Sequence, residues 1–324
     1  MATAAPLAED IMKRRDFFAR ILAGATPFTA LFPAPRSTRR HRAASPAGAG
    51  KLGRVGISTW SFHNHFDSTA DEVVNPAERL VLMDFPEMIA DRYKVHNLEF
   101  VAPHFASLEP AYLEELKGKL LRAHSRLVNI PVDVPAIQKG GGLSDPFPSA
   151  RGRAIAAAKT WIDIAKQMGA RSVRCDPGKM QPDDLTLTTD SYRTLAAYGR
   201  SKAISVLIEN HGSIGSEHPE VLIQLFKNVD DPFLGALPDF GNFPDQATRL
   251  RGLPLLFPYA KTVCHAKGLN LDASGNETRF DFGKCVEISQ RAGYKGVYSI
   301  EYEGPGDAYD GVQKVVNELL RYLH

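Results

Sequence analysis

Short apolar runs that each end in a charged or imidazole side chain most limit how this chain can fold. The run Val206-Leu-Ile-Glu-Asn-His-Gly212 stops abruptly at a carboxylate, an amide and an imidazole. A buried parallel strand has this pattern when its C-terminal end opens into a site. Three later runs end in the same way, at Asp239, His265 and Glu301, and with Glu209 the spacings are 30, 26 and 36 residues. Each spacing is about one strand-helix-strand step, so in a closed α/β barrel the four side chains meet at one mouth.

From Arg54 onward, the whole sequence alternates between apolar runs and amphipathic stretches of helical period. The runs predict strands at 55–58, 97–101, 127–132, 172–175, 206–212, 234–239, 262–265 and 296–301. The stretches between them predict helices at 86–93, 108–125, 149–168, 191–202, 218–228, 247–259, 282–292 and 311–323. Strict alternation predicts a single (β/α)8 TIM barrel over residues 51–324. A dinucleotide fold is not expected, because no Gly-x-Gly-x-x-Gly turn follows the first strand.

Two predicted loops stand out by composition. Residues 59–76 form a long polar loop that carries Trp60 and four other aromatic or imidazole side chains, which favours the wall of a pocket. Gly140, Gly141 and Gly142 lie in a second loop without phosphate-motif spacing. We expect a flexible lip there rather than a phosphate cradle.

The first 50 residues have the composition of an export signal and linker. A basic patch at Lys13-Arg14-Arg15 precedes an uncharged stretch, 21–32, that is too short to span a bilayer, and the small residues Ala47-Gly48-Ala49 follow. Arg14 and Arg15, followed by two phenylalanines, resemble the twin-arginine signal, whose pathway carries folded proteins. The resemblance implies a periplasmic protein. The alternative is a basic arm that binds nucleic acid.

Charge and cysteine content exclude several classes of protein. The whole chain carries +2, but residues 1–50 hold eight Lys/Arg against three acids, so the remainder carries −3. A mildly acidic barrel gives no reason to expect a nucleic-acid partner. The three cysteines, Cys175, Cys264 and Cys285, are odd in number and widely spaced, which predicts buried structural thiols.

Four motifs follow in order along the barrel: Ile208-Glu-Asn-His211, Pro238-Asp-Phe-Gly-Asn242, Val263-Cys-His-Ala-Lys267 and Ser299-Ile-Glu-Tyr-Glu303. With them, residues 54–323 resemble the xylose isomerase-like TIM barrels, the superfamily of sugar phosphate isomerases and epimerases. The resemblance implies one divalent cation held by Glu209, Asp239, His265 and Glu301, with the two glutamates also moving protons. Asn242 stands where the ketose epimerase branch has histidine.

The same residues suggest a chemistry without reference to a family. Three carboxylates and one imidazole suit a hard divalent cation, with Mn²⁺ expected first and Mg²⁺, Co²⁺ or Zn²⁺ as alternatives. Such a metal polarises a carbonyl and stabilises the enediolate that forms when the neighbouring carbon loses its proton. Glu209 and Glu301 are the candidate catalytic acid and base.

Other polar residues near the predicted strand ends are candidate substrate contacts. These are His211, Lys267, Arg174, His104 and Trp60. By contrast, Glu303 and Asp307 are interpreted as solvated loop acids. Tyr298 and Tyr302 alternate with Glu301, which predicts that they pack into the helix layer.

Together these features predict an exported, metal-dependent isomerase or epimerase that acts on a free sugar, keto-sugar or sugar derivative. One alternative is a 3-keto-glycoside lyase, since removal of the C2 proton lets the C1 substituent leave by β-elimination. Another is a non-catalytic sugar-binding barrel. A DNA-repair nuclease is disfavoured by the charge and by Asn242. The expected partner is a small carbohydrate, without nucleic acid or stable membrane insertion; a homo-oligomer is left open.

Overall fold

The computed structural model describes residues 50–324. The predicted export signal therefore lies outside the described residues and stays a prediction. None of the helices between residues 50 and 324 is long and apolar enough to cross a membrane.

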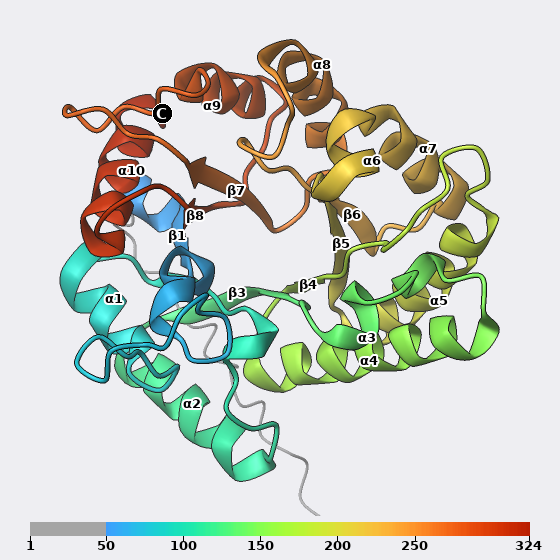
Figure 1. Ribbon diagram of the computed structural model, residues 1–324, viewed down its shortest axis with the longest axis horizontal. Helices are drawn as coiled ribbons and strands as arrows, with labels where there is room; N and C mark the ends of the chain where they lie inside the picture. The colour runs from blue at the N-terminus through green and yellow to red at the C-terminus, as the bar shows by residue number, and fades with distance from the viewer. Residues whose placement is uncertain (1–49) are drawn as a thin grey trace, which may run out of the picture. The chain divides into compact units, whose positions relative to one another are not determined.

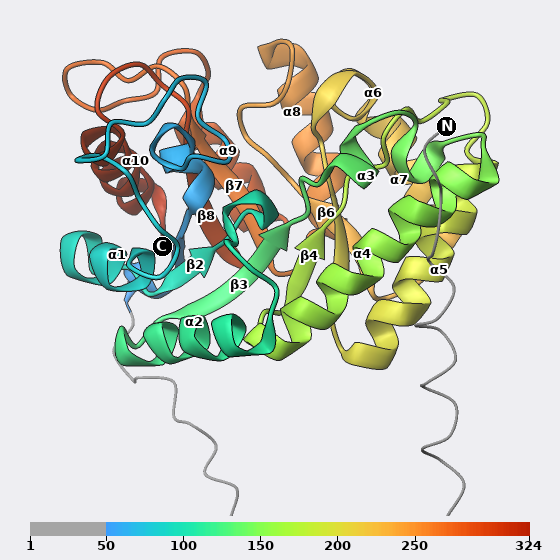
Figure 2. The ribbon, with the colours of Figure 1, turned by 60° about the horizontal axis from the view of Figure 1, so that its bottom comes forward.

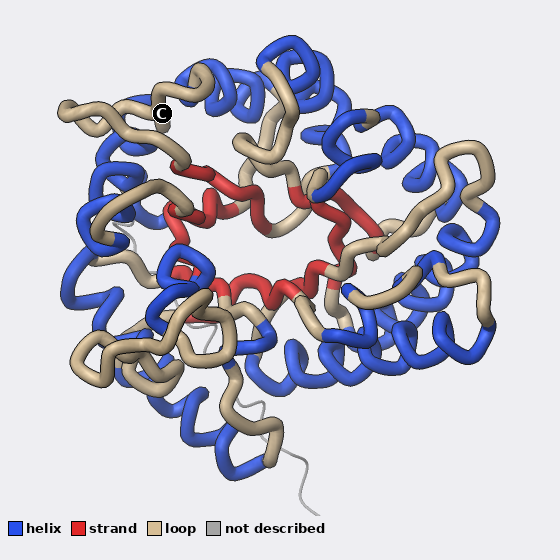
Figure 3. The backbone as a smooth tube through the Cα atoms, viewed as in Figure 1, coloured by secondary structure: helices blue, strands red, loops and turns tan. Residues whose placement is uncertain are grey.

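The chain forms one sheet of eight parallel strands. The strands form a ring at the centre of the fold, as Figures 1 and 3 show. They are β1 (Val55–Ser58), β2 (Asn97–Glu99), β3 (Arg126–Pro131), β4 (Ser172–Arg174), β5 (Ser205–Glu209), β6 (Leu234–Leu237), β7 (Val263–Gly268) and β8 (Val297–Tyr302). The hydrogen-bonded order is β6-β5-β4-β3-β2-β1-β8-β7. Isolated parallel bridges, Ala236 with Ala260 and Asp239 with His265, link β6 to β7 and close the ring. The predicted TIM barrel is confirmed.

Helices lie outside the strand ring (Figure 3), and along the chain they alternate with the strands. The main ones are α1 (Phe85–Tyr93), α2 (Pro110–Arg122), α4 (Pro148–Met168), α5 (Thr186–Lys202), α7 (Pro219–Val229), α8 (Gln246–Leu256), α9 (Phe282–Arg291) and α10 (Ala308–Tyr322). Two short helices, α3 (Pro135–Gln138) and α6 (Gly212–Glu217), lie in loops that follow strands. Figure 2 shows both on the side of the barrel toward which the strands point. The C-terminal mouth is therefore built up by loops and short helices.

Strand alternation separates the site from the helix layer, as predicted. His265 faces the barrel interior, whereas Cys264 is a buried free thiol next to it on β7. Tyr298 packs against Phe240 and Tyr294, with ring centroids 6.3 and 5.4 Å apart. The Tyr302 ring lies against α10. These residues form the apolar support behind β7 and β8.

Helix α5 begins five residues before its predicted start at Ser191. Its first five residues are Thr-Leu-Thr-Thr-Asp, and threonine and aspartate have low intrinsic helix propensity, so the sequence pattern does not predict a helix there. Tertiary hydrogen bonds stabilise these turns: the Thr188 hydroxyl lies 2.8 Å from that of Ser144, and Ser191 donates to the carbonyl of Leu143 at 2.7 Å. Tertiary contacts therefore override local propensity there.

The glycine loop at 140–142 is closely packed, and the expectation of a flexible lip was wrong. Gly142 has a φ of +60°, and a Cβ there would come within 2.3 Å of the Ile137 carbonyl oxygen. A Cβ on Gly141 would come within 2.5 Å of the Cα of Asp145. The glycines are thus required for close backbone approach and for a left-handed conformation.

Candidate metal centre and cavity

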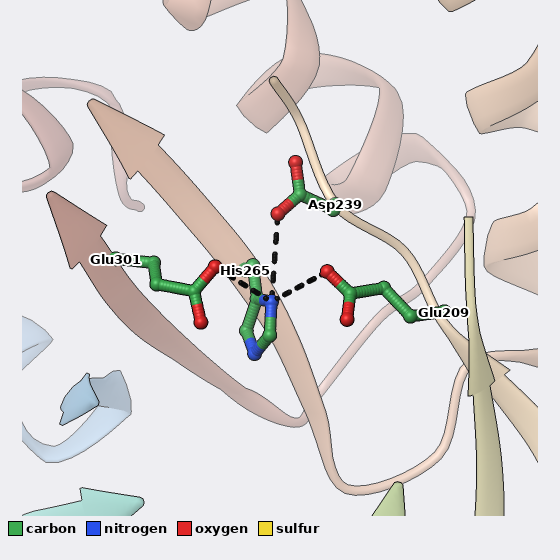
Figure 4. A group of neighbouring side chains, drawn as sticks. All are labelled: Glu209, Asp239, His265 and Glu301. Atoms are coloured by element: carbon green, nitrogen blue, oxygen red, sulfur yellow. Dashed lines mark hydrogen bonds and ion pairs between the residues drawn. The ribbon is translucent and has the colours of Figure 1, made fainter. Parts of the chain in front are cut away.

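Four side chains from consecutive strand ends meet at the C-terminal mouth. Glu209 ends β5, Asp239 follows β6, and His265 and Glu301 lie within β7 and β8. Each offers one ligand atom, and these atoms all lie within 4.8 Å of one another. Figure 4 shows the three carboxylates pointing from different directions at Nδ1 of His265. The distances from Nδ1 to Glu209, Asp239 and Glu301 are 3.0, 3.4 and 3.3 Å. The structure thus brings together the residues predicted as ligands.

The residues fit a cation, because the cluster is buried and some of its carboxylate oxygens make no hydrogen bond. Asp239 is fully buried, and its Oδ1 accepts the backbone N–H groups of Gly241 and Asn242. Among the described residues, its Oδ2 and Glu209 Oε2 make no hydrogen bond, although Lys267 Nζ lies 3.3 Å from the first oxygen and Arg174 Nε lies 3.0 Å from the second. A buried acceptor without a donor is costly unless an ion or water meets it. Both oxygens are therefore available to a divalent cation.

The pKa of His265 reflects the surrounding negative charge. Burial alone would lower this pKa, but Glu301, Glu99 and Glu209 outweigh it and raise the pKa of His265 well above its usual value. A proton on Nδ1 thus lies among the carboxylates. A metal bound at Nδ1 would displace that proton, so metal binding and proton release are linked.

The two candidate catalytic glutamates lie in unlike electrostatic surroundings. Burial raises the pKa of Glu301 to about 7, although His265 and Lys267 oppose the shift. Burial acts on Glu209 in the same direction, but His265 and Arg174 outweigh it and hold the pKa of Glu209 well below its usual range. Two carboxyl groups with separated pKa values are suited to different acid-base roles.

Glu99, at the end of β2, belongs to the site although its place in the sequence predicts no role for it. It is fully buried, and its two oxygens lie 3.3 and 3.1 Å from Nε2 of His265. It also accepts hydrogen bonds from Asn129 and Ser299, both at 2.6 Å. A carboxylate behind a ligand histidine fixes the ring and its tautomer. In the sequence Glu99 lies inside the apolar run 97–101, before Phe100 and Val101, so no local pattern identifies it.

Lys267 connects the carboxylate–histidine cluster to Glu303, a residue that the sequence pattern placed in a solvated loop. Its Nζ lies 2.8 Å from Glu301, 3.3 Å from Asp239 and 2.9 Å from Glu303. Glu303 also accepts a hydrogen bond from the Trp60 indole at 2.7 Å. Glu303 is exposed, as expected for a loop acid, but its carboxylate also pairs with two candidate substrate contacts. Asp307 caps α10 by accepting the backbone N–H of Asp310.

Arg174 organises a second polar group on the opposite side of the cluster. Its guanidinium bonds Asp133 at 2.6 Å and Asp176 at 3.0 Å, and its Nε lies 3.0 Å from Glu209 Oε2. His211 donates to Asp176 at 2.9 Å, and this hydrogen bond raises the pKa of His211 to about 9. Asp176, Glu209 and His211 form a second group of potential ligands. Arg174 already supplies positive charge there.

The substrate candidates divide into two sets. Trp60, Arg174, His211 and Lys267 line a cavity of about 770 Å³ above the cluster, together with Glu209 and Glu301. His104 does not line it. Instead His104 stacks on Phe66 with ring centroids 3.9 Å apart and hydrogen-bonds the hydroxyls of Thr59 and Thr69, both at 2.8 Å. His104 therefore supports the 59–76 loop from below.

The loop at 59–76 contributes some side chains to the wall of the cavity and others to the hydrophobic core. Trp60 and His63 line the cavity and stack on each other with ring centroids 4.8 Å apart. Phe62 and Phe66 are buried and pack against Phe85 of α1. The expectation that these aromatic side chains form a pocket wall therefore holds for Trp60 and His63 but not for Phe62 and Phe66.

The fold and the site together define a TIM barrel with a buried carboxylate–histidine cluster at its C-terminal mouth. The profile of the xylose isomerase-like TIM barrel family matches residues 90–323. The chain belongs to this family. No curated protein sequence is significantly similar to the chain.

Several solved structures share the fold at low sequence identity. A D-tagatose 3-epimerase-like protein has a TM-score of 0.63 at 18% identity, covering 83% of this chain and 97% of its own. A xylose isomerase-like TIM barrel protein from Mycobacterium smegmatis in complex with magnesium has a TM-score of 0.60 at 15% identity, covering 84% and 98%. An IolI protein with a bound zinc atom has a TM-score of 0.62 at 12% identity, covering 83% and 99%.

Proposed function

We propose that the protein is a metal-dependent sugar isomerase or epimerase that removes and returns a proton next to a carbonyl. The observation that carries the proposal is the placement of Glu209 and Glu301 on different sides of His265, in a buried cluster where two carboxylate oxygens make no hydrogen bond. Both glutamates line the cavity, so both face a bound substrate. A purely sugar-binding barrel has no need for two carboxylates with such different pKa values.

Each part of the site has a role in this proposal. Glu209, Asp239, His265 and Glu301 hold one divalent cation, which supplies Lewis-acid polarisation of the sugar carbonyl. One glutamate removes the proton from the neighbouring carbon and the other returns it, each step contributing roughly 10²–10⁴ in rate. Lys267 faces the same cavity and donates to substrate oxygen that gains negative charge. Trp60 offers a flat face on which a sugar ring packs.

The metal we propose is Mn²⁺, with Mg²⁺, Co²⁺ and Zn²⁺ as alternatives. Three carboxylates with a single imidazole favour hard or borderline divalent cations. Solved structures of the same fold contain magnesium in one case and zinc in another. The donor set of this chain accepts either kind.

A second candidate reaction begins with the same step. If the substrate is a 3-keto-glycoside, removal of the C2 proton lets the C1–O bond break while a C1–C2 double bond forms, and the released oxygen takes up a proton. The cavity extends from the cluster past Pro135 and Gln138 to His211, which leaves space for a substituent on the sugar. This extension favours elimination as the alternative outcome.

We also propose that the protein is exported by the twin-arginine route and acts in the periplasm. The proposal rests on the paired arginines and the uncharged stretch behind them. Phosphorylated sugars are mostly cytoplasmic, so the substrate proposed is a free sugar, a keto-sugar or a sugar derivative.

A screen of the Mn²⁺-loaded protein against free ketoses, aldoses and 3-keto-glucosides, with chromatographic separation of isomers before mass spectrometry, tests the proposal. We expect conversion of at least one sugar to an isomer, or release of an aglycone if elimination is the outcome. The Glu209→Gln variant serves as the matched control, since it keeps an oxygen ligand of similar shape but removes the base. Equal product from wild type and Glu209→Gln would contradict the proposed mechanism.

A further inference from the structure

A second cavity lies beside the first. It measures about 460 Å³ and is bounded by the loop after β4, residues 176–180, and by the start of α6. The two cavities share Gln138 and His211, so they adjoin at these two side chains. Each volume falls in the range of roughly 300–1,000 Å³ that is typical of small-molecule sites. Together they exceed what one sugar ring requires.

The wall of the second cavity is held in place by close backbone packing. Gly178 has a φ of +75°, and a Cβ there would come within 2.2 Å of the Gly141 carbonyl oxygen. Lys179 donates its backbone N–H to that same oxygen at 3.1 Å, and Ser144 donates to the Pro177 carbonyl at 2.7 Å. The 140–145 and 176–180 loops therefore brace each other, and the cavity is preformed.

The lining combines apolar faces with a few polar groups, as sugar sites do. Met180 and Ile214 supply apolar surface, while Gln138, Lys179 and Asp176 supply donors and acceptors. Asp176 Oδ2 is occupied by Arg174 and His211, but Asp176 Oδ1 is buried without a hydrogen-bond partner among the described residues. A ligand hydroxyl group is a suitable donor for that oxygen.

From these observations we infer that the second cavity is a subsite for a second sugar unit, and that the substrate is a glycoside whose reacting ring lies at the metal cluster. The glycosidic bond then lies near His211 and Gln138, where the cavities adjoin. This inference rests on the proposed function, because the cluster identifies which ring reacts.

The test compares two probes on the full, Mn²⁺-loaded protein: a 3-keto-hexose, and a keto-disaccharide in which the same keto-hexose is linked through C1 to glucose. Loss of the proton next to the carbonyl is followed by NMR in D₂O for each probe. We expect wild type to have a kcat/KM at least about 10-fold higher for the disaccharide, because a filled second subsite adds binding energy that is used in the transition state.

Substitutions in the second cavity test whether the preference for the disaccharide arises there. Ile214→Trp places a large ring in the second cavity, and we expect it to lower the disaccharide preference by at least about 10-fold. Lys179→Ala adds no bulk and should lower the preference by about threefold through a lost polar contact. Leu121→Trp, at an exposed position on α2 that lines neither cavity, is the matched control and should keep the full preference.

The outcomes separate the subsite from the proposed function. The subsite would be overturned by equal kcat/KM values for both probes in wild type, or by a disaccharide preference that Ile214→Trp leaves intact. In either case, removal of the proton would still support the proposed function. If neither probe loses its proton, the proposed function fails and the subsite fails with it.

Discussion

Replacing Glu99 with Gln tests whether the buried carboxylate behind His265 controls metal binding at the proposed centre. Three donors converge on this carboxylate: His265 Nε2, Asn129 Nδ2 and Ser299 Oγ. Gln keeps the shape of Glu but offers one acceptor oxygen and an NH₂ group in place of two acceptor oxygens. At least one of the three donors then faces an N–H group, and the negative charge next to His265 is lost.

The size of the effect follows from what Glu99 does to the histidine. Loss of a carboxylate behind a metal ligand typically lowers metal affinity by about 10–100-fold, which corresponds to about 1.4–2.7 kcal/mol. Glu99 is also one of the charges that raise the pKa of His265, although burial opposes them. In Glu99→Gln this pKa falls toward its usual value. Fewer protons are then released when the metal binds near neutral pH.

Titration calorimetry of the metal-free protein with Mn²⁺, in two buffers of different ionisation enthalpy, measures affinity and proton release together. Glu318→Gln is the matched control, since Glu318 is also a buried glutamate but lies on α10 and bonds the backbone of Glu277. We expect the control to match wild type in both quantities. A folded Glu99→Gln protein with wild-type affinity and proton release would refute the reasoning.

Three further predictions address the ligands, the pH dependence of stability and the export signal. His265→Ala and Asp239→Ala should each lose bound metal in elemental analysis, and wild-type metal content in both would rule out the proposed centre. Burial raises the pKa of Glu318 to about 7, so its contribution to stability is complete below about pH 4.5 and is lost as pH rises through 7. Urea unfolding should therefore show Glu318→Gln more stable than wild type at pH 8, by about 1–3 kcal/mol, with a smaller difference at pH 4.5; an equal difference at both values would contradict this. A reporter fusion carrying Arg14→Lys with Arg15→Lys should stay inside the cell, whereas unaltered export would exclude the twin-arginine route.

The sequence was sufficient to predict the barrel and the convergence of the four candidate metal ligands at one mouth. Their convergence follows from one rule, that parallel strands deliver their C-terminal ends to the same mouth, and the strands around Glu209 and Glu301 have clear apolar patterns. Residues that depend on tertiary contacts were harder to interpret. Glu303 follows β8 and has the sequence context of a loop acid, yet Lys267 and Trp60 bond its carboxylate.

Two other features required three-dimensional information for the same reason. Glu99 ends a strand of only three residues, and nothing local shows that Nε2 of His265 lies 3.1 Å away across the barrel. The glycines at 140–142 suggest flexibility by composition, whereas packing against the 176–180 loop determines their conformation. Local pattern identifies strand ends, but pairing between distant loops depends on the complete fold.

Deuterium exchange at carbon tests the central claim most directly, because it detects proton abstraction before any product forms. Mn²⁺-loaded wild type, incubated with keto-sugars in D₂O, should incorporate deuterium next to the carbonyl. Glu209→Gln and Glu301→Gln should keep part of their metal affinity while turnover falls by roughly 10²–10⁴. If one of the two variants still exchanges the proton without forming product, its intact glutamate is the base. If metal-loaded wild type exchanges no carbon-bound proton with any keto-sugar, the proposed enzyme is contradicted and a sugar-binding barrel is the better explanation.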